Sequence, residues 1–120
     1  MMAKKQMKSV PPPPPTLAEL YGAVTTALAA RDTAADLLAV ARGELDEAES
    51  DFETAISALR TALANQSGVD EAADTVATMD IDRQTKLATF NTRADAFNTA
   101  RATLTTAIAA LQQRLAEINN

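Results

Sequence analysis

The chain has 120 residues, a formal net charge of −5, no cysteine and no histidine. The lack of both side chains removes the usual ligands of a zinc site and the usual general base at neutral pH, so we expect no enzyme activity, metal, cofactor or small-molecule substrate. The acidic balance also argues against nucleic-acid binding by the body of the chain.

Alanine dominates the apolar residues of this sequence. Hydrophobic residues make up 47% of the chain, but aromatic residues make up only 3%. This composition favours long helices packed closely along their length over a globule with a thick core. No apolar run approaches the roughly 20 residues needed to cross a bilayer, and no apolar stretch follows the N-terminal lysines, so we expect a soluble chain without a secretory signal.

The segment 1–15 is predicted to be a basic, extended arm. It ends in five consecutive prolines, which adopt a stiff polyproline II rod of roughly 3 Å per residue. Three interpretations remain open: a spacer that stops the helix from propagating backwards, an arm that docks on a neighbouring subunit, or a ligand for a proline-binding domain. The residues predicted to dock are Lys4, Lys5, Lys8, Pro11, Pro12, Pro13, Pro14 and Pro15.

A first helix is predicted over residues 16–66 and a second over 69–119. Thr16 and Glu19 form the capping-box pattern T-L-A-E directly after the last proline, which indicates a sharp helix start. The sequence N-Q-S-G at residues 65–68 is the only turn signal in the rest of the chain. Gly68 can adopt a positive φ there, and Ser67 can cap the second helix.

The apolar residues of both segments recur at alternating spacings of three and four, which is typical of a heptad seam. If the chain folds back at residues 66–68, seam residues whose numbers total 135 or 136 oppose each other. We therefore predict an all-α fold, a long antiparallel two-helix coiled-coil hairpin; a compact four-helix bundle with breaks near Gly43 and near Asp80 is the alternative. The large apolar residues assigned to the seam are Leu17, Tyr21, Val24, Leu28, Leu38, Leu45, Phe52, Phe90, Phe97, Leu104, Ile108, Leu111, Leu115 and Ile118.

A column of alanines runs beside this seam on the first helix. Small residues at seven-residue intervals permit another helix to approach closely, although alanine is also the best helix former. We predict that the column is an oligomer face, which would thicken a core too thin to be very stable alone. Its members are Ala27, Ala34, Ala41, Ala48, Ala55 and Ala62.

Two further patterns lie outside the seam. Threonine recurs at every seventh residue from Thr78 to Thr106, on the face farthest from the seam, where helix propensity does not explain its choice. Six acidic residues lie between Glu44 and Glu53. They spread around several helix faces and have no glycine-containing ligand loop, so we interpret them as a solvated collar that receives the basic arm of a neighbour and not as a calcium site.

These features predict a non-catalytic structural or assembly protein. The helical rod would pack in a larger oligomeric assembly, and the arm would latch onto a neighbouring subunit. By analogy of architecture and size, a virion component of a phage, such as a cement, connector or fibre protein, is the setting we favour. The alternative is a dimeric adaptor that presents the polyproline arm to a proline-binding domain through a protein–protein interaction.

Overall fold

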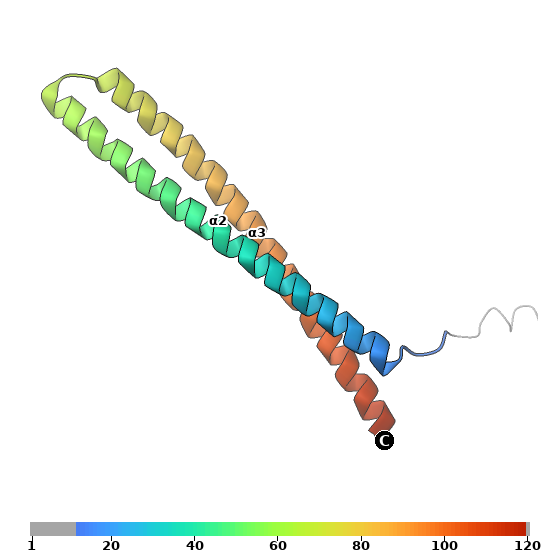
Figure 1. The fold of residues 1–120 in the computed structure, drawn as a ribbon. Coiled ribbons are helices and arrows are strands. Elements are labelled where there is room, and N and C mark those ends of the chain that lie inside the picture. The colour runs from blue at the N-terminus through green and yellow to red at the C-terminus, as the bar shows by residue number, and fades with distance from the viewer. Residues whose placement is uncertain (1–11, 120) are drawn as a thin grey trace, which may run out of the picture.

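The computed structural model describes residues 12–119, which form two long α-helices joined by a short turn (Figure 1). Helix α2 spans Leu17–Asn65 and helix α3 spans Val69–Asn119. They pack against each other as an antiparallel hairpin, a rod 79 Å long. The predicted all-α hairpin is confirmed, and the four-helix bundle is wrong, because both helices continue unbroken through Gly43 and Asp80.

The first turn of α2 is capped as the sequence pattern predicts. The Thr16 hydroxyl accepts a hydrogen bond from the Glu19 amide at 3.1 Å, and the Glu19 carboxylate accepts one from the Thr16 amide at 3.0 Å. These bonds satisfy two backbone donors that have no partner within the helix. The Thr16 backbone and side-chain hydrogen bonds lower the pKa of Glu19, so the support that its charge gives to the helix start is lost as the pH falls through that lowered pKa.

The turn depends on two residues with a left-handed backbone. Gln66 caps the C-terminus of α2 with φ 52° and ψ 40°, and its amide reaches the carbonyls of Ala62 and Leu63. The Ser67 amide bonds the Ala62 carbonyl at 3.1 Å. Gly68 follows with φ 70°, and its carbonyl accepts the first bond of α3. The positive φ of Gly68 agrees with its predicted role, whereas nothing in the sequence singled out Gln66.

Substituting Gly43 and Gly68 by alanine is expected to change stability in opposite directions. Nothing lies within 4 Å of an added Cβ at Gly68 or at Gly43, so neither change creates a clash. The left-handed φ of Gly68 penalises a Cβ, and Gly68→Ala should cost about 1 kcal/mol. Gly43 lies inside α2, where Gly43→Ala should stabilise by about 1 kcal/mol. Urea denaturation of both variants measures this; the same sign for both would contradict it.

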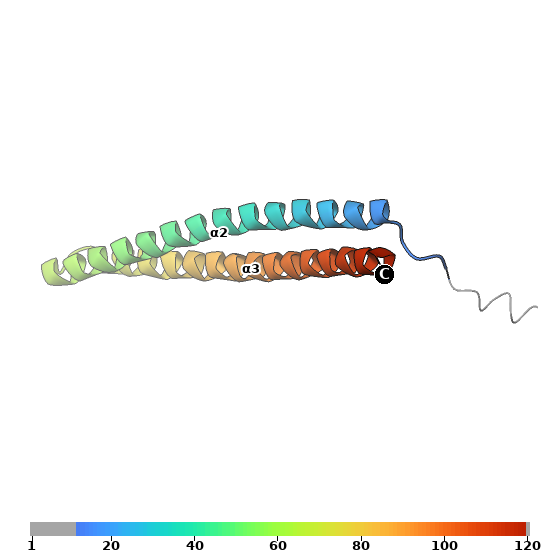
Figure 2. The ribbon, with the colours of Figure 1, turned by 90° about the horizontal axis from the view of Figure 1, so that it is seen from below.

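The two helices wind around each other along the rod. They cross in the view of Figure 1 and, seen from below in Figure 2, are separated at the open end and overlap at the turn. The guanidinium of Arg83 lies 4.7 Å from the centre of the Phe52 ring, so these two residues oppose each other. Their numbers total 135, which agrees with the predicted pairing. Leu38 and Phe97, with the same total, line one groove.

The alanine column of α2 forms the centre of the helix–helix interface. Ala41 and Ala48 are only 3% exposed, and Ala27 and Ala55 are also buried, although the structure holds a single chain. The prediction that this column is an oligomer face is therefore corrected for these four residues, because α3 covers them. Alanine has no side chain beyond Cβ, so the two backbones approach closely along this column. The only other buried residue in the described part of the chain is Leu104.

Candidate interaction surfaces

The structure divides the predicted seam into two sets. Val24, Leu38, Leu45 and Phe52 of α2 are half-buried beside the alanine column. From α3, Leu104 is buried, and three more side chains are half-buried: Phe90, Phe97 and Leu111. The remaining predicted seam residues are exposed, which corrects their assignment; they are Leu17, Tyr21, Leu28, Ile108, Leu115 and Ile118.

Leu17 and Ile118 share columns with the half-buried Val24 and Leu111 and are exposed because they lie at the open end of the rod, whereas the other four residues are exposed for a different reason. The interface uses the alanine column of α2 in place of the column that contains Tyr21 and Leu28. On α3 it uses the half-buried column that contains Ala100 and Ala107, so both helices are rotated about their axes relative to the prediction. The displaced column flanks the interface, and α3 has an equivalent column that contains Leu87 and Ile108. We call the two columns together the flank face. Its members are Tyr21, Leu28, Ala35, Arg42, Glu49, Ile56 and Leu63 of α2, with Ala73, Asp80, Leu87, Ala94, Arg101, Ile108 and Leu115 of α3.

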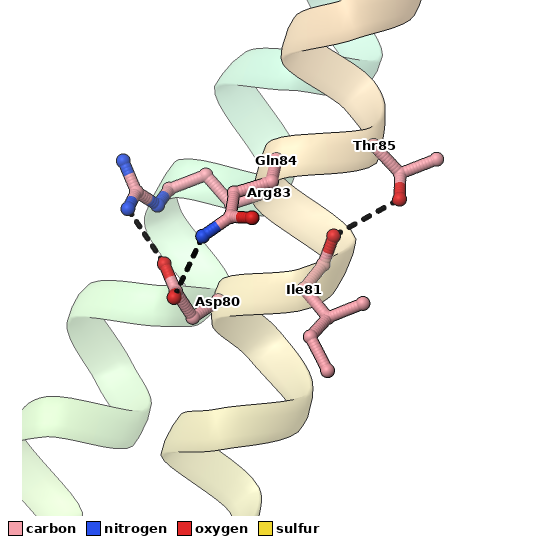
Figure 3. Close-up of polar contacts among 5 residues, drawn as sticks. All are labelled: Asp80, Ile81, Arg83, Gln84 and Thr85. Carbon is pink, nitrogen blue, oxygen red and sulfur yellow. Dashed lines mark hydrogen bonds and ion pairs between the residues drawn. The ribbon is translucent and has the colours of Figure 1, made fainter.

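A polar cluster interrupts the apolar interface in the first third of α3, towards the turn (Figure 3). Arg83 Nη2 donates to Asp80 Oδ1 at 2.6 Å, and Gln84 Nε2 donates to Asp80 Oδ2 at 3.0 Å. Arg83 also covers the Phe52 ring, and its Nε is buried without a hydrogen-bond partner among residues 12–119. Both hydrogen bonds lie within α3, so the contact between Arg83 and Phe52 is what links this cluster to α2.

One ion pair joins the two helices across the rod. Lys86 Nζ lies 3.7 Å from Glu44 Oε2, and both side chains are partly exposed. Exposed pairs contribute roughly 0 to 1 kcal/mol, so this contact adds to alignment more than to stability. Glu44 belongs to the acidic run, and residues 12–119 contain no group of three or more acidic side chains arranged to hold a metal ion. The predicted arm residues Lys4, Lys5, Lys8 and Pro11 lie outside the described residues.

The last four prolines of the arm lie at the open end of the rod. Pro12 to Pro15 are exposed. Pro14 and Pro15 line a shallow depression together with Leu20 of α2 and Ala110 and Arg114 of α3. The end of the arm therefore lies beside the depression between the two helices, at the place where α2 begins and α3 approaches its last turns.

The threonine column lies on the exposed outer surface of α3. The Thr85 hydroxyl donates to the Ile81 carbonyl at 3.0 Å, as Figure 3 shows, and the Thr92 hydroxyl donates to the Ala88 carbonyl at 3.1 Å. Each donor is thus satisfied by the carbonyl one turn earlier in its own helix. A threonine surface that recognises a ligand needs hydroxyls pointing outward, and these two hydroxyls are already paired locally.

Searches against protein-family models, curated proteins and solved structures give no match to this chain. The surfaces are therefore interpreted from their own chemistry. Neither helix in residues 12–119 has the length and apolar content to cross a membrane. The depressions along the rod are shallow and lie between neighbouring helix side chains, as the one lined by Leu20, Ala23 and Ala107 does. The candidate interaction surfaces of the described residues are therefore the flank face of the rod and the proline-rich segment at its open end.

Proposed function

We propose that this protein is a non-catalytic structural or assembly protein. Its rod packs against other protein subunits through the flank face, and its N-terminal arm latches onto a neighbouring subunit. The observation that carries the proposal is the exposure of large apolar side chains along the flank face, of which Tyr21 is 64% exposed. Contiguous exposed apolar surface is typical of protein interaction sites. A phage particle is the assembly that we favour, by analogy of architecture and size alone.

The latching arm is proposed to bind the acidic run of a neighbouring copy. The arm carries Lys4, Lys5 and Lys8, and the run carries six carboxylates between Glu44 and Glu53. Opposite charges across such a contact attract, and dissolved salt screens that attraction. Each proline has a fixed φ, so Pro12 to Pro15 lose little conformational entropy when the arm docks.

A peptide of residues 1–15 is expected to bind a chain that lacks those residues, with an affinity that falls as salt rises. Fluorescence anisotropy of the labelled peptide measures this binding. The matched control is the same peptide with Lys4, Lys5 and Lys8 replaced by glutamine, which should bind more weakly and with little salt dependence. Equal binding of both peptides at all salt concentrations would exclude an electrostatic latch.

The second candidate function is an adaptor for a proline-binding domain. It is favoured by the exposure of Pro12 to Pro15, which leaves their rings accessible to an aromatic groove. Titration of an isolated proline-binding domain with the full chain distinguishes the two functions. Saturable binding that is lost when residues 1–15 are deleted supports the adaptor, whereas no binding to such domains, combined with binding of the arm peptide to the rod, supports the latch.

A further inference from the structure

We propose that a second copy of this chain docks on the flank face in the opposite direction, which produces an antiparallel four-helix dimer. This inference rests on the proposed function and names one partner for the rod. Three properties of the flank face support it: the exposure of its apolar residues, the order of its charges and its length.

The two columns of the flank face lie on the same side of the hairpin. The flank columns lie four residues after the seam column of Val24 on α2 and four residues after the seam column of Arg83 on α3. In an antiparallel pair of helices, these two columns fall on the same side. On this side of the hairpin, Ala35 and Arg42 of α2 line one groove with Phe90 and Phe97, which are seam residues of α3. Of the eleven large apolar side chains exposed in residues 12–119, six belong to this face, so the exposure is concentrated there; they are Tyr21, Leu28, Leu63, Leu87, Ile108 and Leu115.

The charges of the flank face have a self-complementary order. The register that pairs Phe52 with Arg83 sets the level of each residue along the rod. From the open end towards the turn, four successive levels carry Arg101, Arg42, Glu49 and Asp80, two positive charges followed by two negative ones. Among residues 12–119, Arg42, Arg101 and Glu49 form no ion pair within the chain. These three charged groups are therefore available to a partner.

A two-fold axis perpendicular to the rod, midway between Arg42 and Glu49, matches every charge of this face with its opposite. It lays α2 on α2 of the second copy and α3 on α3. Arg42 then faces Glu49 of the second copy, and Arg101 faces Asp80 of the second copy. Because the two-fold axis repeats each contact, the interface gains two Arg42–Glu49 pairs, and two Arg101 side chains approach Asp80 carboxylates that Arg83 already binds within each chain. A parallel arrangement would instead gather the arginines of both copies at neighbouring levels and the carboxylates at the next, which is repulsive.

The same axis also pairs part of the apolar surface and gives a sufficient interface, while Tyr21 and Leu115 lie beyond the overlap. It places Leu28 opposite Leu63 of the second copy and Ala94 opposite Leu87. The overlap covers about 40 residues of each helix, or about 60 Å at 1.5 Å per residue. With two helices side by side at about 9 Å spacing, the face is about 18 Å wide and buries on the order of 1,000 Å² per chain. Stable protein interfaces bury about 800 Å² per partner.

Charge reversal tests the pairing of Arg42 with Glu49. Glu49→Arg places two arginines opposite each other and should raise the dimer dissociation constant, measured by analytical ultracentrifugation, by about tenfold or more. Arg42→Glu should do the same with two carboxylates. The double variant Arg42→Glu with Glu49→Arg restores opposite charges and should return the dissociation constant to within about threefold of the original. The matched control is Glu47→Arg, an exposed position of α2 outside the flank face, which should change it little.

Engineered cysteines test the direction, because the natural chain has none. A mixture of Leu28→Cys chains with Leu63→Cys chains should form a covalent dimer under mild oxidation. A mixture of Leu28→Cys chains with Ile108→Cys chains should not, since these positions meet only in a parallel dimer. Circular dichroism of each variant checks that the helices are intact.

The outcomes separate this inference from the proposed function. A dimer that survives deletion of residues 1–15, responds to the charge reversals and links Leu28→Cys to Leu63→Cys supports it. The inference is wrong if the chain is a monomer or if Leu28→Cys links to Ile108→Cys. It is also wrong if Glu49→Arg leaves the dimer unaffected or if deletion of residues 1–15 abolishes the dimer. Each of these failures leaves binding of the arm peptide to the rod to be measured independently, so the latch stands or falls on its own result.

Discussion

Replacing Leu104 with alanine is expected to lower the free energy of unfolding by about 2 to 3 kcal/mol, in the lower part of the range for buried leucines. Leu104 is the largest buried side chain of the described residues, and it is 7% exposed. Its removal takes three carbon atoms out of an interface with few other buried atoms. The cost stays below the largest known values because two helices with water on both sides can close partly over the gap.

Urea denaturation at one fixed protein concentration measures this effect, since self-association would otherwise contribute to the apparent stability. The control is Leu37→Ala, which makes the same chemical change at a side chain that is 41% exposed. It should cost less than about half as much, because less apolar area leaves contact with protein. Equal losses for the two variants would show that Leu104 does not occupy the core of the rod.

Enlarging the alanine column is expected to destabilise the hairpin although it adds apolar surface. Ala48→Leu should lower the free energy of unfolding by about 1 to 3 kcal/mol, because three extra carbon atoms have no space between closely packed backbones. If Ala48 lay on an outer surface, the same change would be nearly neutral, since leucine and alanine have similar helix propensities. A large loss of stability would therefore place the alanine column in the helix–helix interface, and a near-neutral result would place it on the outer surface.

The matched control for Ala48→Leu is Ala29→Leu in the same helix. Ala29 is exposed, so its larger side chain meets solvent and should change stability by less than about 0.5 kcal/mol. Thermal denaturation followed by circular dichroism compares the two variants. Similar melting temperatures for both would contradict close packing along the alanine column.

The sequence predicted the architecture because its strongest signals are local and agree with each other. The capping box at Thr16, the absence of proline after Pro15 and the single turn signal at Gly68 determine where two long helices begin and end. The pairing of Phe52 with Arg83 followed from the length of each helix on either side of that turn. Each of these features depends on a few neighbouring residues or on counting, and none depends on how closely the helices approach.

The rotation of the two helices could not be derived in the same way. On α2, Val24 and Leu38 belong to one apolar column, which has the large residues Tyr21 and Leu28 on one side and alanines on the other. Burying large side chains favours the first neighbour, whereas close approach of two backbones favours the second, and the balance depends on contacts across the whole interface. The recurrence of alanine at every seventh residue was the available signal. It correctly indicated a close neighbour, but that neighbour is α3 of the same chain.

Because of that rotation, the candidate interaction surface is the flank face and not the alanine column. Arg42, Glu49 and Arg101 appear in the sequence as polar interruptions of a seam, where they weaken the hairpin. On the flank face they become accessible charges in a symmetric order, and this order is visible only after both columns are placed on one side. The left-handed Gln66 also had no signal in the sequence, because glutamine does not favour that backbone conformation.

The start of α2 and the end of α3 lie at the same end of the rod, as Figure 1 shows. Anything joined to the chain before Thr16 or after Asn119 therefore leaves from one pole. The turn at Gln66 therefore lies close to 79 Å, the length of the hairpin, from an object attached at that end. In the antiparallel dimer the two poles point away from each other, so the protein would act as a strut that sets the spacing between whatever its two ends carry.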